Sequence, residues 1–384
     1  MNILDSSLAA VGSRSAIRFG AVLFALAAVM APTHAQDAPV NISLNGVVAI
    51  AADDIWAVGN GTDPNDADNT DPAFEHWNGS AWQIIPSKRT LEDQELINGV
   101  GASGPNDVWA VGSVGQPFTI PRQIEIQHWD GNAWSFVAAE QVTGDDLLDG
   151  VAAIAPDDAW AVGSTRSGGA RRDRALAEHW NGSQWRSVPL PDPQGVDFLH
   201  KVAAVSSTDV WAVGSFQPAG DSHPLAMHWD GTTWSIVPVP APPRDCALSD
   251  VVAIASDNVW AVGTSFEFSV PSHSHGFIVH WDGTAWSVVS SPSTGSFDAD
   301  GLATVTAISS KDIWSLGNSV NQRQQTLAEH WNGRAWKFFP APTSFVMNDA
   351  AAVASDDVWA VGWNLNASII EHWDGRRWSV VPSP

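Results

Sequence analysis

One histidine recurs in each of seven similar segments of the chain, together with one acidic or amide residue. The histidine stands directly before a Trp, and the acid stands two residues before an earlier Trp of the same segment. The histidines are His76, His128, His179, His228, His280, His330 and His372. Their counterparts are Asp54, Asp107, Asp158, Asp209, Asp312 and Asp357, with Asn258 in the fifth segment. Side chains of these types could bind a metal ion or form structural hydrogen bonds.

The spacing of the seven histidines argues against a shared metal site. Zinc needs three or four ligands that converge on one point. Each histidine belongs to a different segment, at the same place in it, so the seven are expected to lie far from one another. We therefore expect each imidazole to bond within its own segment, and the recurring Asp is a plausible partner.

An acidic loop in the first segment is a second candidate for metal binding. It carries Asp63, Asp66, Asp68 and Asp71. Hard oxygen ligands at this density suit calcium. The loop departs from the EF-hand pattern, because Ala67 occupies a ligand position and the closing Glu is missing. Calcium is thus a possible cofactor, and a solvated acidic loop is the favoured alternative.

Two later loops could hold a ligand of another kind. The third segment contains the one dense basic group, Arg166, Arg171, Arg172 and Arg174. Guanidinium groups bind carboxylate or sulfate in a bidentate manner, although such a loop can also be solvated or paired within the chain. The loop of the fifth segment contains Phe266, Phe268, His273 and His275, and the seventh segment adds Trp363. Exposed aromatic side chains suit a sugar-binding surface, but each could instead pack beneath its own loop.

The segments that carry these residues repeat about every 50 residues. Each has three Trp at matching places, and together they account for 21 of the 22 Trp in the chain. The first Trp of each segment is Trp56, Trp109, Trp160, Trp211, Trp260, Trp314 or Trp359. All-β units of this length are typical of propeller blades. The sequence therefore predicts an all-β, seven-bladed β-propeller with four antiparallel strands per blade, in which the Trp side chains fill the space between blades.

The blade cores are predicted from the turn and strand patterns. An Asn-Gly or Asp-Gly pair follows the His-Trp pair in every segment and predicts a tight type I′ hairpin. The first strands are rich in Val, Ala and Ile, so the central channel is expected to lack a ring of charged side chains. Variable connections collect on one side of the disc, where binding usually occurs. The predicted blade cores are approximately 46–86, 99–138, 150–189, 201–238, 250–289, 303–340 and 349–382.

Residues 1–35 read as a secretory signal peptide. Arg14 and Arg18 precede the apolar run 21–31, and small residues at Thr33 and Ala35 offer a cleavage site. Export to the extracellular space or periplasm is therefore expected, without stable membrane insertion after cleavage. The net charge of −24 disfavours nucleic acid and anionic lipid as partners. The single Cys246 cannot form an internal disulfide.

The phrases D-V-W-A-V-G and H-W-D-G-x-x-W, which end at Gly362 and Trp378 in the last segment, resemble the Trp-rich repeats of tectonin-type lectins. The length of the unit is more similar to that of kelch repeats. The resemblance implies a propeller that binds glycans of microbial surfaces without catalysis. The chain has no Tyr, so the Tyr-dependent chemistry of galactose-oxidase-like and sialidase-like propellers cannot operate.

These observations predict a secreted, non-catalytic binding scaffold. The favoured ligand is a glycan or a cell-surface ligand, held by the variable loops. A protein–protein scaffold is the main alternative. An enzyme such as a polysaccharide lyase or hydrolase, using loop carboxylates with His273 or His275, is the third.

Overall fold

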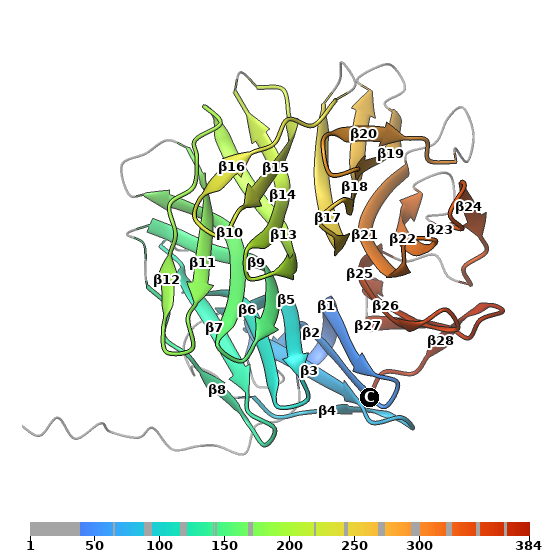
Figure 1. Cartoon of the computed structure of the whole chain (residues 1–384). Helices are drawn as coiled ribbons and strands as arrows, with labels where there is room; N and C mark the ends of the chain where they lie inside the picture. Colours follow the sequence, from blue (N-terminus) through green and yellow to red (C-terminus); the bar gives the residue numbers. More distant parts are fainter. Residues whose placement is uncertain are drawn as a thin grey trace, which may run out of the picture. The chain divides into compact units, whose positions relative to one another are not determined.

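The computed structural model describes one compact unit within residues 37–384. The described residues are 39–63, 66–87, 94–115, 121–140, 142, 144–167, 172–218, 220–241, 245–267, 273–292, 300–319, 325–342, 346–364 and 367–384. This part of the chain forms seven sheets of four antiparallel strands, arranged as a β-propeller. In Figure 1 the sheets follow one another in colour order around a common centre. The predicted fold class is confirmed.

Each blade is built from consecutive strands, from the hub outward. The first, innermost strands are β1 (Val40–Ala51), β5 (Gln94–Gly104), β9 (Gly144–Ala155), β13 (Val196–Ser206), β17 (Cys246–Ala255), β21 (Asp300–Ser309) and β25 (Val346–Ala354). The second strands are β2 (Asp54–Asp63), β6 (Asp107–Gly115), β10 (Asp158–Ser167), β14 (Asp209–Gln217), β18 (Asn258–Glu267), β22 (Asp312–Ser319) and β26 (Asp357–Asn364).

The outer half of each blade is a second antiparallel pair. The third strands are β3 (Asp66–Trp77), β7 (Gln123–Trp129), β11 (Arg174–Trp180), β15 (His223–Trp229), β19 (His273–Trp281), β23 (Gln325–Trp331) and β27 (Ala367–Trp373). The outermost strands are β4 (Trp82–Ile84), β8 (Trp134–Phe136), β12 (Trp185–Ser187), β16 (Trp234–Ile236), β20 (Trp286–Val289), β24 (Trp336–Phe339) and β28 (Trp378–Val381). Within the described residues, no helix is long and apolar enough to cross a membrane.

The strand directions give the disc two different faces. Short turns join the first strand to the second and the third to the fourth, and they share one side, which we call the turn face. The connections between second and third strands and between successive blades share the other side, which we call the loop face. The variable residues of the sequence therefore lie on the loop face.

The turn after each His-Trp pair differs from the predicted type I′ hairpin. In blade 1 the paired residues Trp77 and Trp82 enclose four residues, and only Gly79 has a positive φ, of 86°. The side chain of Asn78 stabilises this four-residue turn, because its Oδ1 accepts hydrogen bonds from the backbone N–H groups of Ser80 and Ala81. An Asx turn of this kind explains why Asn or Asp precedes the Gly in every blade.

Tryptophan pairs join each blade to the next, as predicted. The ring of Trp56 in blade 1 meets Trp134 of blade 2 edge-on at 5.3 Å and lies 4.8 Å from Trp129. Trp56 and Trp134 are both 1% exposed. Aromatic pairs in such arrangements contribute roughly 0.5–1.5 kcal/mol each beyond the area that they bury. The indole rings are thus the inter-blade core, repeated around the disc.

The central channel is more polar than the Val, Ala and Ile of the first strands predicted. Every first strand has a β-bulge at the same level, and the side chain after the bulge is charged or polar in four blades, Lys201, Asp250, Thr304 and Asp349. Nζ of Lys201 in blade 4 lies 2.9 Å from Oδ2 of Asp349 in blade 7. Blades 4 and 7 are not neighbours, so this ion pair crosses the hub.

The ring closes between complete blades rather than by sharing one blade between the two ends of the chain. Strand β1 pairs with β2 of its own sheet, and β25 with β26. Across the seam, Nδ2 of Asn348 donates to the carbonyl of Leu44, and the N–H of Val47 donates to Asp349. Oγ of Ser383 also lies 2.9 Å from the Glu75 carboxyl group.

Candidate functional site

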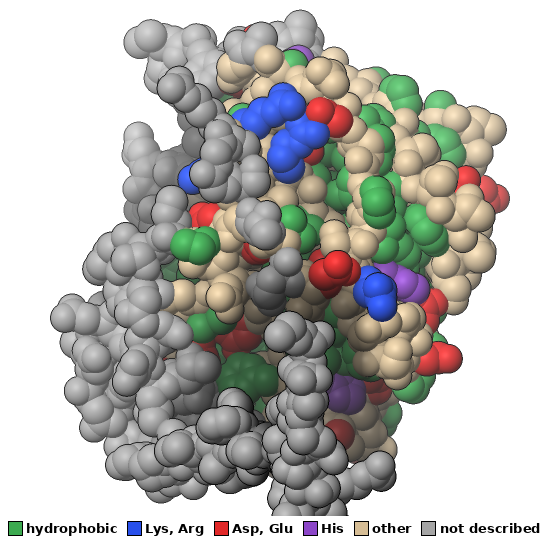
Figure 2. Space-filling model, turned by 90° about the vertical axis from the view of Figure 1, so that its left-hand side faces the viewer, with side chains coloured by type: hydrophobic (Ala, Val, Ile, Leu, Met, Phe, Trp, Pro, Cys, Tyr) green, Lys and Arg blue, Asp and Glu red, His purple; other side chains and the backbone are tan. Residues whose placement is uncertain are grey.

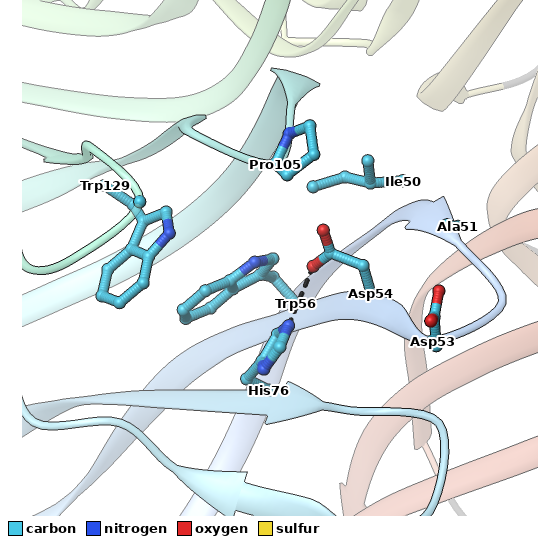
Figure 3. Close-up of a pocket in the computed structure, with 9 residues that line it drawn as sticks. Ile50, Ala51, Asp53, Asp54, Trp56, His76, Pro105 and Trp129 are labelled. Atoms are coloured by element: carbon cyan, nitrogen blue, oxygen red, sulfur yellow. Dashed lines mark hydrogen bonds and ion pairs between the residues drawn. The ribbon is translucent and has the colours of Figure 1, made fainter.

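The recurring histidine and its acidic counterpart form a hydrogen bond in all seven blades. The distance from His Nε2 to the Asp or Asn Oδ1 is 2.7–2.9 Å throughout. Figure 3 shows the pair in blade 1, where Nε2 of His76 faces Asp54. Each imidazole also packs on the first Trp of its blade, as His76 does on Trp56 at 4.5 Å. Each histidine therefore makes a hydrogen bond within its own blade, in the manner expected from the sequence.

The environment of the pairs depends on the partner. Burial raises the pKa of Asp107, but hydrogen bonds from His128, Ser103 and Trp109 outweigh it and hold that pKa below its ordinary value. In blade 5 the partner is the neutral Asn258, and burial lowers the pKa of His280. Both shifts follow from packing and local hydrogen bonds.

The arginines of blade 3 are paired within the chain. The guanidinium of Arg166 binds Asp173 with two bonds, from Nε at 2.5 Å and from Nη2 at 2.8 Å. Nη2 of Arg174 lies 2.6 Å from Asp192, and Arg172 lies 3.4 Å from the same carboxylate. Arg171 is outside the described residues. The structure thus brings three of the four predicted basic residues together, each with a carboxylate partner.

This pairing changes what the basic loop can do. Such exposed pairs contribute little to stability, and a stronger anion could displace their carboxylates. Figure 2 shows basic and acidic side chains next to each other on this side of the molecule. The loop therefore presents an alternating charge pattern rather than an open anion site.

Buried or half-buried carboxylates at the loop face join neighbouring blades, and they were not among the predicted site residues. Asp145 at the start of β9 accepts a bond from the backbone N–H of Arg122 in blade 2 and pairs with its guanidinium at 3.0 Å. Asp197 in blade 4 accepts from the N–H of Ala175, and Asp245 in blade 5 accepts from that of Ser222. In the sequence, these residues can be found as an Asp at the start of a first strand, or directly before it.

The predicted aromatic residues reach the surface in two separate blades. Phe266 is 42% exposed on β18, and Trp363 is 37% exposed on β26. His273 and His275 lie on β19, opposite Glu267 and Ser265, and are half-buried. Phe268 lies outside the described residues. Blade 6 separates the two exposed rings, so they could contact one extended ligand but do not form a single cluster.

Most side chains of the predicted calcium loop lie outside the described part of the chain. The side chains of Asp63, Asp66 and Asp68 are not described, and Asp71 is buried opposite Gly61. No group of three or more His, Cys, Asp or Glu among the described residues is arranged to hold a metal ion. Calcium binding by this loop stays a prediction.

The hub contains acidic groups with strongly raised pKa values. Burial raises the pKa of Asp149 to about 7, against the opposing effects of Lys201 and Arg122. Burial also raises the pKa of Asp250 to about 6. Desolvation would lower the pKa of Lys201, but the surrounding carboxylates reverse this and raise it. Thr304 Oγ1 bonds to both Asp250 and Asp349, so the hub side chains are fully engaged with one another.

Comparison with known proteins supports the fold and leaves the family open. No family model and no curated protein matches the sequence. Among solved structures, the chain is similar to YCF48 bound to a D1 peptide, with a TM-score of 0.56, 14% identity, and coverage of 88% of this chain and 94% of that one. It is similar to a PL25 ulvan lyase bound to -[GlcA(1-4)Rha3S]-, with a TM-score of 0.58, 10% identity, and coverage of 90% and 96%.

A third similar structure is a GH74 xyloglucanase from Xanthomonas campestris. It gives a TM-score of 0.59 at 10% identity, and the match covers 90% of this chain and 55% of that one. Identities this low are informative about the fold alone. The closer assignment to tectonin-type or kelch propellers stays a prediction, and what these comparisons establish is a Trp-rich, seven-bladed β-propeller.

Proposed function

We propose that this chain is an exported, non-catalytic binding scaffold that recognises glycans through its loop face. The observation that carries the proposal is the exposure of Phe266 and Trp363 on that face, above strands that are otherwise buried. Flat apolar rings with nearby polar groups are typical of ligand surfaces that accept sugars and other amphipathic molecules. Ser274 pairs with Phe266 and supplies a polar group on the same face of the sheet, whereas the half-buried His273 and His275 lie on the opposite face.

The loop-face carboxylates favour binding over catalysis. A general acid or base must reach a substrate atom with a free oxygen. Asp145, Asp197 and Asp245 instead accept backbone N–H groups of the preceding blade, where they hold the loops in place. One oxygen of each therefore has a structural task that a catalytic role would disturb.

A protein partner is the second candidate, and the outer strands favour it. Val288, Phe338 and Val380 occupy matching positions on β20, β24 and β28 and are 54%, 36% and 47% exposed. Outer strands also leave backbone groups unpaired along the rim. A propeller that binds peptides or proteins could use this edge, and YCF48 with its D1 peptide is a propeller in complex with a peptide.

A glycan array tests the proposal. The purified protein should bind a subset of glycans, and Phe266→Ala or Trp363→Ala should weaken that binding at least tenfold. Phe136→Ala is a matched control, because Phe136 is equally exposed, at 42%, but lies on the outer strand β8. Absence of glycan binding by the native protein would reject the proposal, as would equal binding by the native protein and both loop-face variants.

A further inference from the structure

A pocket of about 430 Å³ opens on the turn face between blades 1 and 2. Blade 1 contributes Ile50, Asp53, Asp54, Trp56 and His76, and blade 2 contributes Pro105 and Trp129 to its lining. In Figure 3 the Asp54 carboxylate lies between the Trp56 and His76 rings on one side and Ile50 and Pro105 on the other. The volume lies in the range of roughly 300–1,000 Å³ that is usual for ligand sites.

The indole of Trp129 is different from its counterparts in the other blades. In those six blades the Trp after the His donates its Nε1–H to a backbone carbonyl of the turn between the first two strands. In blade 1, for example, Trp77 donates to Ala52 at 3.1 Å. Trp129 makes no such bond to Pro105, or to any other described residue. This donor is left available at the pocket.

A second indole in the same pocket is also without a partner. Trp56 is 1% exposed, and its Nε1 has no hydrogen-bond partner among the described residues. In blades 2, 5 and 7 the corresponding indole donates to its own turn, as Trp109 does to Asp107 at 3.1 Å. As in Trp56, the buried Nε1 has no hydrogen-bond partner among the described residues in Trp160, Trp211 and Trp314.

Among the described residues, one pair of neighbouring blades brings together two indoles that both lack a hydrogen-bond partner at Nε1; we call the space between two blades at this level a groove. Each groove combines the first Trp of one blade with the second Trp of the next. The grooves that contain Trp160, Trp211 and Trp314 each have a second Trp whose Nε1–H is already bonded to its turn. The groove between blades 1 and 2 joins Trp56 to Trp129. A buried N–H without a partner costs roughly 1–3 kcal/mol, and this applies to Trp56. Trp129 is half-buried, so its N–H is the donor that a ligand in the pocket meets directly.

Acceptors lie beside these donors. Asp54 bonds to His76 through Oδ1 at 2.8 Å, and it lines the pocket together with the exposed Asp53. Ile50 and Pro105 form an apolar wall. Indole donors, carboxylate acceptors and apolar contacts thus meet in one small volume.

A hydroxyl group suits this set better than the other ligand classes do. It can accept from an indole N–H and donate to a carboxylate at the same time. A cation would pair with the carboxylates but leave the indole N–H groups unused. An anion would face Asp53 and Asp54 in a protein whose net charge is already −24.

We infer that the pocket between blades 1 and 2 binds a neutral sugar residue, at a site separate from the loop face. The site goes beyond the proposed function because it needs neither Phe266 nor Trp363. Trp129 is its specificity-determining residue, since the freed N–H is what distinguishes this groove. Asp54 supplies the matching acceptor.

Indole ¹⁵N–¹H NMR tests the site directly. Methyl glycosides of neutral sugars are titrated into the purified protein to millimolar concentration. At least one should shift the Trp129 and Trp56 N–H resonances in a saturable manner. Choline, a glycoside of a uronic acid and 3,3-dimethylbutan-1-ol serve as the cationic, anionic and apolar probes. Stronger saturable binding of any of these three at Trp129 would overturn the inference, and so would the absence of any shift with the neutral glycosides.

Substitutions separate this site from the loop face. Trp129→Phe keeps the ring but removes the N–H, and should weaken glycoside binding at least tenfold. Trp331→Phe is the matched control, because its indole donates to Ser310 in blade 6 and not into this pocket. Asp54→Asn, with Asp312→Asn as its control in blade 6, gives a second comparison if Trp129→Phe folds poorly.

The two proposals can fail independently. If Phe266→Ala and Trp363→Ala abolish all sugar binding while Trp129→Phe leaves it intact, the pocket is not a sugar site and the loop-face proposal stands. If the indole shifts persist in the loop-face variants and the glycan array shows no dependence on Phe266 or Trp363, the pocket stands and the loop-face proposal fails.

Discussion

Nζ of Lys201 on β13 lies 2.9 Å from Oδ2 of Asp349 on β25, across the centre of the disc. The two residues are 148 positions apart and belong to blades that do not touch through their sheets. Asp349 also accepts the N–H of Val47 at the seam between blades 7 and 1. One carboxylate therefore serves both the hub ion pair and the closure of the ring.

Removing the hub cation should destabilise the propeller. Lys201→Met leaves Asp349 and Asp250 buried without their cation, and breaking a buried pair in this way costs about 3 kcal/mol or more. Urea unfolding followed by Trp fluorescence measures the loss. Lys311→Met, in an exposed turn of blade 6, should change the free energy of unfolding by less than about 0.5 kcal/mol. Equal effects of the two substitutions would show that the hub pair is not stabilising.

Stability should fall as the pH rises from mildly acidic to alkaline. Four buried glutamates at matching positions on third strands have pKa values raised chiefly by burial: about 7 for Glu75, about 8 for Glu178, about 8 for Glu329 and about 7 for Glu371. The folded pKa exceeds the unfolded one, so their contribution is complete below about pH 4.5 and is lost as the pH passes through 7 to 8. Thermal unfolding should show a falling Tm between pH 6 and pH 9.

A neutral isostere gives the control for this pH dependence. Gln127 already occupies the corresponding position in blade 2 and is fully buried. Glu178→Gln should therefore fold and should flatten the decline of Tm above pH 6. A Tm that rises from pH 6 to pH 9, or an unchanged slope in the variant, would contradict the assignment.

Restoring the missing carboxylate in blade 5 should shift a histidine. Nε2 of His280 lies 2.8 Å from the neutral Asn258, and burial lowers the pKa of its imidazole. Asn258→Asp places a negative charge at this distance, which favours the imidazolium and raises the pKa of His280. NMR titration of the His280 ring measures the change. Asn258→Ser adds no charge and should not raise this pKa, so a rise in both variants would point to altered packing instead.

The Gly that ends each D-V-W-A-V-G phrase should not tolerate a side chain. A Cβ added at Gly163 would lie 2.1 Å from the carbonyl oxygen of Leu147 on the adjacent first strand. This backbone atom cannot move away without disturbing the hub, so Gly163→Ala should cost about 1–3 kcal/mol. Gly104→Ala is the control, because an added Cβ there meets nothing within 4 Å. Urea unfolding of both variants should show a large loss for the first and little change for the second.

Local patterns and repetition in the sequence determined the fold, the blade count and the role of the recurring residues. Trp56 and His76 recur at equal spacing, and seven equal units of this size can bury their Trp only against one another. The pairing of His76 with Asp54 follows from the same repeat: His76 lies opposite Trp56 on the adjacent strand, and Asp54 precedes Trp56 by two residues on the same face. These relations are short in sequence or identical in every blade, so a single chain suffices to predict them.

Only the tertiary structure decided what departs from the repeat. Lys201 and Asp349 meet because seven blades close into a ring, and the local apolar pattern of the first strands gave no sign of that contact. The arginines of blade 3 pair with carboxylates, and one of these, Asp192, lies in the connection to blade 4. Trp129 occupies the same place in the sequence repeat as its six counterparts, but its N–H makes no hydrogen bond to the turn, whereas theirs do. Such differences arise from the way that neighbouring blades pack, and packing is a property of the assembled disc rather than of any one segment.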